Sequence, residues 1–90
     1  MEHYYLYTFE STHGAISTEK LMKSLGCTVM PVPRSISTSC GISVRVETEK
    51  FDESVRLFKA GSELADDEYT VYSIESDKKA GIFNFQKVTI

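Results

Sequence analysis

The order of strand-like and helix-like segments limits the fold of this 90-residue sequence more than any other feature. Residues 3–9 form an aromatic run whose side chains alternate between two faces, and 42–46 alternate apolar with polar residues, as half-buried β-strands do. A short β-branched run over 28–32 predicts another strand. Two more strands are expected over 69–74 and 82–90.

Two segments between these strands carry apolar residues at helical spacing. The first is expected to begin at a capping hydroxyl, Ser11 or Thr12, and to end at Gly26, because glycine adopts the left-handed conformation of helix ends without strain. The second is expected to begin with Thr48 as its cap and to end at Gly61. The predicted order is therefore β-α-β-β-α-β, with one further strand at the end.

This order is typical of an α+β fold, the ferredoxin-like split βαβ sandwich, in which two helices cover one face of an antiparallel sheet. We expect a single domain over 1–90, because a chain of this length builds one core. Within it, 1–75 forms the ferredoxin-like core and 76–90 a C-terminal hairpin extension, whose turn is expected over 76–81. The added strand can also lie at a sheet edge and make a dimer contact.

Composition and charge exclude several classes of protein. A hydrophobic fraction of 41% and a charged fraction of 26% are typical of a globular chain. No apolar run approaches the roughly 20 residues that span a bilayer, and the first residues do not resemble a secretory signal. We therefore expect a cytoplasmic protein without a membrane partner. A net charge of −3 gives no overall attraction to phosphate backbones, so no nucleic-acid partner is expected.

The segment 31–41, between the second and third strands, has the most suggestive chemistry. Pro31 and Pro33 remove backbone donors and turn the chain away from a central sheet position. Serine and threonine residues follow, which favour local hydrogen bonds over regular structure. The segment closes with Cys40 and Gly41, so it is predicted to be a loop that ends in a thiol.

The sequence resembles a known family in four places: 7–13, Glu19-Lys20-Leu21, Gly26, and 32–41, which reads Val-Pro-Arg-Ser-Ile-Ser-Thr-Ser-Cys-Gly. These motifs are similar to those of the DUF3343 family of selenium/sulfur carrier-like proteins, over roughly residues 4 to 60. The resemblance implies a small bacterial ferredoxin-like domain whose loop cysteine accepts sulfur or selenium from a donor protein and hands it to an acceptor protein. The C-terminal part, about 76–90, is longer than in many members.

Sulfur transfer requires an accessible cysteine with a lowered pKa, because the thiolate is the nucleophile. Cys40 is the expected persulfide acceptor. The guanidinium groups of Arg34 and Arg45 flank it in the sequence, and the backbone amide of Gly41 is suited to an anion-binding concavity. The candidate binding residues are Arg34, Ser37, Ser39, Gly41, Arg45 and His13.

His13 falls at the junction of the first strand and the first helix. We expect the loop that leaves the second strand to lie at the opposite end of the sheet from this junction. On that expectation, His13 reaches Cys40 only if the 31–41 segment folds back along the sheet. A contact of that kind would let the imidazole and the helix N-terminus lower the pKa of the thiol.

Structural interpretations of the same residues remain open at this point. Cys40 can be a small core residue, and Cys27, directly after the helix stop, is better explained by half-buried packing than by chemistry. The two arginines can be solvated charges, and the hydroxyls can satisfy their own loop. A disulfide between the two cysteines is not excluded. Two cysteines at this spacing do not form a metal-binding knuckle, and no metal or cofactor is expected.

The sequence contains no nucleophile elbow, no phosphate-binding glycine loop and no zinc-protease helix. A self-contained enzyme is therefore not supported, and the leading hypothesis is a carrier or accessory protein. The alternative is a non-catalytic regulatory module that binds a small anion or another protein through 31–41. Such a module can form a homodimer through a sheet edge.

Overall fold

The computed structural model describes residues 2–33, 36, 41–62, 64–65 and 67–90. It contains one five-stranded sheet in the order β2-β3-β1-β4-β5, and every neighbouring pair is antiparallel. The α+β class is therefore confirmed, whereas the ferredoxin-like assignment remains a prediction. The strands are β1 (Glu2–Phe9), β2 (Thr28–Pro31), β3 (Ile42–Glu47), β4 (Tyr69–Asp77) and β5 (Ile82–Val88). The helices are α1 (Thr12–Leu21) and α2 (Phe51–Gly61), accompanied by 3-10 turns over Lys23–Leu25 and Thr48–Lys50.

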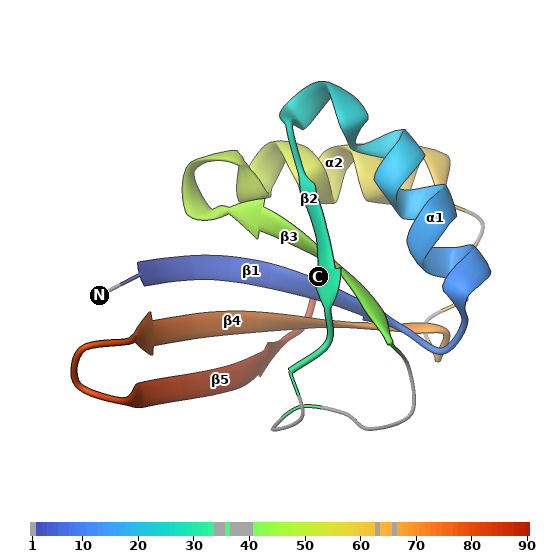
Figure 1. The fold of residues 1–90 in the computed structure, drawn as a ribbon. Helices are drawn as coiled ribbons and strands as arrows, with labels where there is room; N and C mark the ends of the chain where they lie inside the picture. Colours follow the sequence, from blue (N-terminus) through green and yellow to red (C-terminus); the bar gives the residue numbers. More distant parts are fainter. Residues whose placement is uncertain (1, 34–35, 37–40, 63, 66) are drawn as a thin grey trace.

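Both helices lie on the same side of the sheet (Figure 1). The main core forms between them and the strands, because the residues of β1, β3 and β4 that face this side are apolar. Tyr7 and Val44 from the sheet and Met22 after α1 are completely buried there. The buried members of this core are Tyr7, Phe9, Ala15, Met22, Leu25, Val44, Val46, Phe58 and Val71.

The other side of the sheet carries a second, smaller core. Leu6 and Ile74 are completely buried on this side, and Tyr4 is 5% exposed. Ile36, from the connection between β2 and β3, packs against them, together with Phe83 from β5. The central strand β1 is thus covered on both faces, by helices on one side and by loop and strand side chains on the other.

The ends of the helices agree in part with expectation. The Ser11 hydroxyl accepts a hydrogen bond from the Gly14 amide at 3.2 Å, which confirms the predicted cap of α1. Gly26 has the predicted left-handed conformation, with a φ of +72°, but it closes the 3-10 turn Lys23–Leu25, and α1 itself ends earlier than predicted, at Leu21. The prediction of Thr48 as a cap is wrong, because its hydroxyl donates to the His3 carbonyl at 2.8 Å and accepts no amide as a cap, and both the 3-10 turn and α2 begin without a side-chain cap.

The C-terminal hairpin begins later than expected. Ser76 and Asp77 still pair with Phe83 and Ile82, so β4 extends beyond the predicted end and the turn is shorter. Gly81 closes this turn with a φ of +68°, a conformation that favours glycine. The predicted boundary between 75 and 76 therefore falls inside β4, and the division into core and extension remains a prediction. In the described part of the chain, no helix is long and apolar enough to cross a membrane.

A buried hydroxyl pair links β1 to α2. The Ser54 hydroxyl donates to the Phe51 carbonyl at 2.7 Å, which leaves the Tyr7 hydroxyl to donate to Ser54 at 3.0 Å. Burial raises the pKa of Tyr7 from its ordinary value of 10 to about 12. Because the folded state disfavours the phenolate, this contribution to stability is complete below pH 10 and is lost as the pH rises through about 12.

We expect Tyr7→Phe to remove this alkaline loss of stability. In the unmodified chain the pKa shift corresponds to about 2–3 kcal/mol of unfolding free energy lost between pH 10 and 12. Urea unfolding at a series of pH values would measure it for both chains, and the other tyrosines and lysines titrate equally in each. Parallel pH profiles for the two chains would contradict the prediction.

Candidate functional site

The predicted site lies at the connection between β2 and β3. The two ends of this connection, at Val32 and Gly41, form what we call its base. They continue the hydrogen-bond ladder of the two strands, because the Val32 amide donates to the Gly41 carbonyl at 3.4 Å. Two residue pairs further in, the Ser43 hydroxyl donates to the Met30 carbonyl at 3.0 Å. Ile36 donates its amide to the Pro33 carbonyl at 3.0 Å. These bonds hold the base of the connection.

Four of the predicted site residues lie outside the described residues: Arg34, Ser37, Ser39 and Cys40. Gly41, the chain neighbour of Cys40, is described and exposed. A Cβ added at Gly41 would meet no described atom within 4 Å, so the space beside this residue is open.

The strand register corrects the expected position of His13. Thr8 of β1 pairs with Ser43 of β3, and Pro31 of β2 pairs with Ile42, so the carboxyl ends of β1 and β2 lie at the same end of the sheet. The physical reason is that α1 crosses over between two strands that both run antiparallel to β3 and hence parallel to each other. The expectation that the loop and the first junction lie at opposite ends was wrong.

His13 is an exposed residue of the first turn of α1, at the same end of the sheet as Gly41. It belongs to the helix-covered side, whereas Ile36 of the connection packs on the other side. No part of the connection has to run the length of the sheet for the two regions to approach. Contact between His13 and Cys40 remains a prediction.

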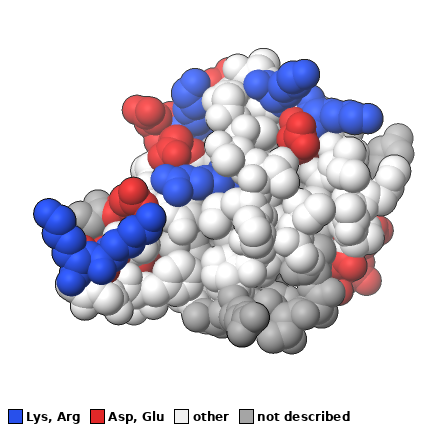
Figure 2. Space-filling model, in the orientation of Figure 1, with Lys and Arg blue, Asp and Glu red and all other residues white. Residues whose placement is uncertain are grey.

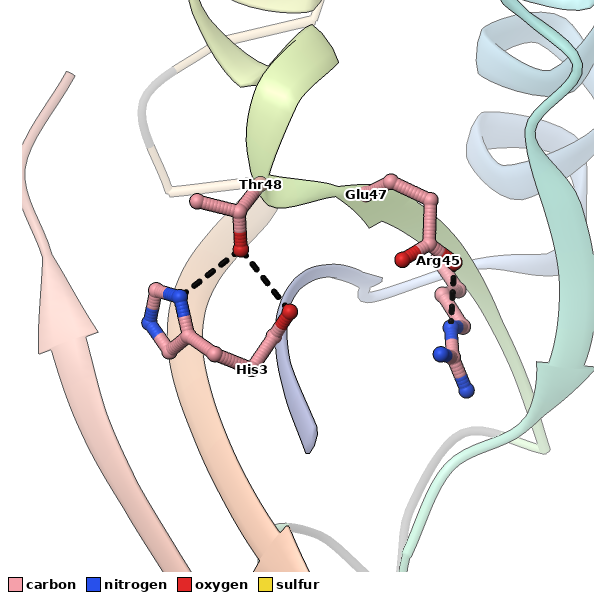
Figure 3. Close-up of polar contacts among 4 residues, drawn as sticks. All are labelled: His3, Arg45, Glu47 and Thr48. Atoms are coloured by element: carbon pink, nitrogen blue, oxygen red, sulfur yellow. Dashed lines mark hydrogen bonds and ion pairs between the residues drawn. The ribbon is translucent and has the colours of Figure 1, made fainter. Parts of the chain in front are cut away.

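Arg45 already has two partners. Its Nε lies 3.1 Å from Oε1 of Glu47 (Figure 3). Its guanidinium carbon lies 4.0 Å from the centre of the Tyr4 ring. Both contacts are on the side of the sheet away from the helices, where Arg45 pairs with Leu6. Arg45 lies three positions after Ile42, which is about 10 Å along an extended strand. A role for Arg45 beside Cys40 remains a prediction.

Cys27 occupies a packing position, as expected. It is half-buried against the helix-side core, and its Sγ lies 3.9 Å from the Glu19 carbonyl. Burial and the nearby Glu19 carboxylate raise the pKa of its thiol. Cys27 is free, so the disulfide that the sequence left open is not formed. It precedes β2 directly, at the end of the sheet opposite to Gly41.

The sequence analysis missed a polar cluster at that opposite end. His3 Nδ1 lies 2.7 Å from the Thr48 hydroxyl (Figure 3). On the other side of the ring, His3 Nε2 lies 2.8 Å from the Ser73 hydroxyl. Since the Thr48 hydroxyl donates to the His3 carbonyl, Nδ1 is the nitrogen that donates to Thr48. The three residues are distant in sequence, so no local pattern indicated the cluster. It ties β1 to β4 and to the start of the second helical segment.

Among the described residues, no group of histidine, cysteine and acidic side chains is suited to hold a metal ion.

Comparison with known proteins identifies the family. A family model described as "Putative Se/S carrier protein-like" matches residues 4–66. The chain belongs to this family. The match confirms the predicted resemblance and runs from β1 through α2, ending before β4. Neither the curated proteins nor the solved structures contain a match to the chain.

Proposed function

We propose that the chain is a sulfur or selenium carrier in which Cys40 holds the cargo as a persulfide or selenopersulfide. Membership of a family described as Se/S carrier-like supports a general carrier role. We also propose that the domain is ferredoxin-like, which the placement of β3 between β1 and β2 supports, and that it acts in the cytoplasm.

The position of Cys27 is the single observation that supports Cys40 as the cargo residue in this proposal. A carrier thiol has to be accessible and must ionise readily, because the thiolate is the attacking species. Cys27 is half-buried, contacts a backbone carbonyl and has a raised pKa. The sequence contains two cysteines, so Cys40 is the one that remains.

The surroundings of Gly41 support access by partner proteins. Gly41 is exposed and no described residue crowds it, and the Val32 amide, which donates to the Gly41 carbonyl, holds the two ends of the connection together. The N-terminus of α1 lies at the same end of the sheet, and its partial positive charge favours a nearby anion. In this proposal Arg34, Ser37, Ser39 and His13 bind the anion, and Arg45 contributes at longer range.

The transfer is an exchange that needs no external oxidant. The Cys40 thiolate attacks the terminal sulfur of a donor protein's persulfide, a new bond forms between the two sulfurs, and the donor's own sulfur–sulfur bond breaks. The donor cysteine leaves as a thiolate with the bonding electron pair. An acceptor thiolate then attacks the same terminal sulfur, and Cys40 leaves as the thiolate. Selenium follows the same course when the terminal atom is selenium.

We expect the loaded chain to carry the added sulfur on the peptide that contains Cys40. The experiment incubates the chain with a protein persulfide donor, removes the donor, and maps the added mass by proteolysis and mass spectrometry. The Cys27 peptide is the internal control, because its thiol is half-buried. Label confined to the Cys27 peptide, or no label on either peptide, would overturn the proposal.

A further inference from the structure

The outer edge of β5 is one of the two margins of the sheet. Among the described residues, β5 pairs with β4 alone (Figure 1). The opposite margin, β2, is four residues long and ends in Pro31, a residue that discourages pairing at an edge. β5 has seven residues and contains no proline and no glycine. β5 is thus the longer of the two edges and lacks the proline that ends β2, and Lys87 is its one charged residue.

The two faces of β5 differ in character. Phe83, Phe85 and Lys87 point to the side away from the helices, since their partners on β4 include Ile74 and Tyr72. Phe85 remains 42% exposed although it contacts the Tyr72 ring edge-on, with the ring centres 5.8 Å apart. Asn84 and Gln86 are exposed on the other face. An exposed edge strand with unburied aromatic surface is typical of an interaction site.

We propose that β5 pairs with β5 of a second copy of this chain, antiparallel and centred on Phe85. This register places Phe85 opposite Phe85 of the partner copy, Asn84 opposite Gln86, and Phe83 opposite Lys87. The pairs are an aromatic pair at the twofold axis, two amide pairs, and two aromatic–cation pairs. The strand is self-complementary in this register, and the two sheets join into one with the helices of both copies on the same side.

Charge favours this direction of pairing. Lys87 is the only charged residue of β5, and the register keeps the two copies of Lys87 about 13 Å apart along the strands. Lys78 and Lys79 lie in the turn between β4 and β5, where Figure 2 shows blue side chains gathered. An antiparallel pair carries the two cationic turns to opposite ends, whereas a parallel pair would place them side by side. This complementarity favours a second copy over an unrelated strand as the occupant.

Two charge variants test the register. Asn84→Lys with Gln86→Lys places lysines opposite each other across the dimer, and we expect a dissociation constant about tenfold higher than that of the unmodified chain. Asn84→Lys with Gln86→Glu is the matched control, because it creates two ion pairs across the same contact and preserves the dimer. Both pairs of substitutions fall on exposed polar residues, so the monomer should fold alike, as circular dichroism would verify. Sedimentation equilibrium measures the dimer.

A cross-linking experiment reports the geometry directly. In a chain with Cys27→Ala and Cys40→Ser, we expect Phe85→Cys to form a disulfide-linked dimer under mild oxidation, because opposite residues of an antiparallel pair lie within disulfide range. Gln86→Cys is the control and should not cross-link, since its counterpart lies two residues away along the partner strand. A chain that is monomeric at every concentration, or a dimer that both charge variants leave unchanged, would overturn the proposal. The result does not depend on sulfur loading of Cys40.

Discussion

Replacing Cys40 with serine should abolish sulfur carriage completely, while Cys27→Ala should leave it within about twofold of the unmodified chain. A hydroxyl cannot form a persulfide at this position, and serine leaves no second accessible thiol to take the cargo. Cys27 contacts the helix-side core and the Glu19 carbonyl, and its pKa is raised, so its removal affects packing and not transfer. The assay measures transfer of labelled sulfur from a persulfide donor through the chain to a thiol acceptor.

Thiol reactivity provides an independent control for this prediction. At neutral pH the Cys40 thiol should be alkylated at least about tenfold faster than the Cys27 thiol, because a lower pKa gives more thiolate. The Cys40→Ser chain gives the alkylation rate of Cys27 alone, and the Cys27→Ala chain gives the rate of Cys40 alone. Equal rates, or continued transfer by Cys40→Ser, would show that the cargo is held elsewhere.

The second prediction concerns the core on the side of the sheet away from the helices. Leu6→Ala should lower the free energy of unfolding by about 3 kcal/mol, the size expected when a fully buried leucine leaves a cavity. Total stabilities of small domains are about 5–15 kcal/mol, so this is a severe loss. Leu6 lies on the central strand β1 between Tyr4 and the residues of β4, with Ile36 packed on the same cluster.

Two comparisons make the Leu6 result informative. Met22→Ala removes a fully buried side chain from the helix-covered core and should cost a similar amount. Ile16→Ala changes a residue that is 45% exposed on α1 and should cost less than about 0.5 kcal/mol. Urea unfolding measured by circular dichroism gives all three values. A cost for Leu6→Ala no larger than that for Ile16→Ala would show that this side of the sheet is not a core.

Local sequence signals predicted most of the elements because each depends on near neighbours. The alternation of β1 and β3, the Ser11 cap and the left-handed Gly26 are all properties of a few consecutive residues. The prediction that Thr48 caps a helix failed because the partner of its hydroxyl is distant in the sequence. A threonine at the start of a helix usually caps it, but the carbonyl and ring of His3, 45 residues earlier, compete for the same hydroxyl.

For the candidate site too, local features were predictable from the sequence, whereas contacts between distant segments were not. The family motif and the two cysteines were visible in the sequence, and the match over residues 4–66 confirmed the motif. The sequence could not show that Arg45 is held by Glu47 and the Tyr4 ring, because the Tyr4 contact depends on the pairing of β1 with β3. It also gave the wrong end of the sheet for the junction at His13, an error that the register corrected.

The sequence by itself determined the element order and the family, because both are encoded in residue type and local spacing. Only the tertiary structure decided which residues share a surface. It buried Leu6 in a cluster against which Ile36 packs, paired Tyr7 with Ser54 and placed β5 at the edge of the sheet. These contacts join strands and helices far apart in the chain, and their energies depend on burial and register, which appear only when the sheet has formed.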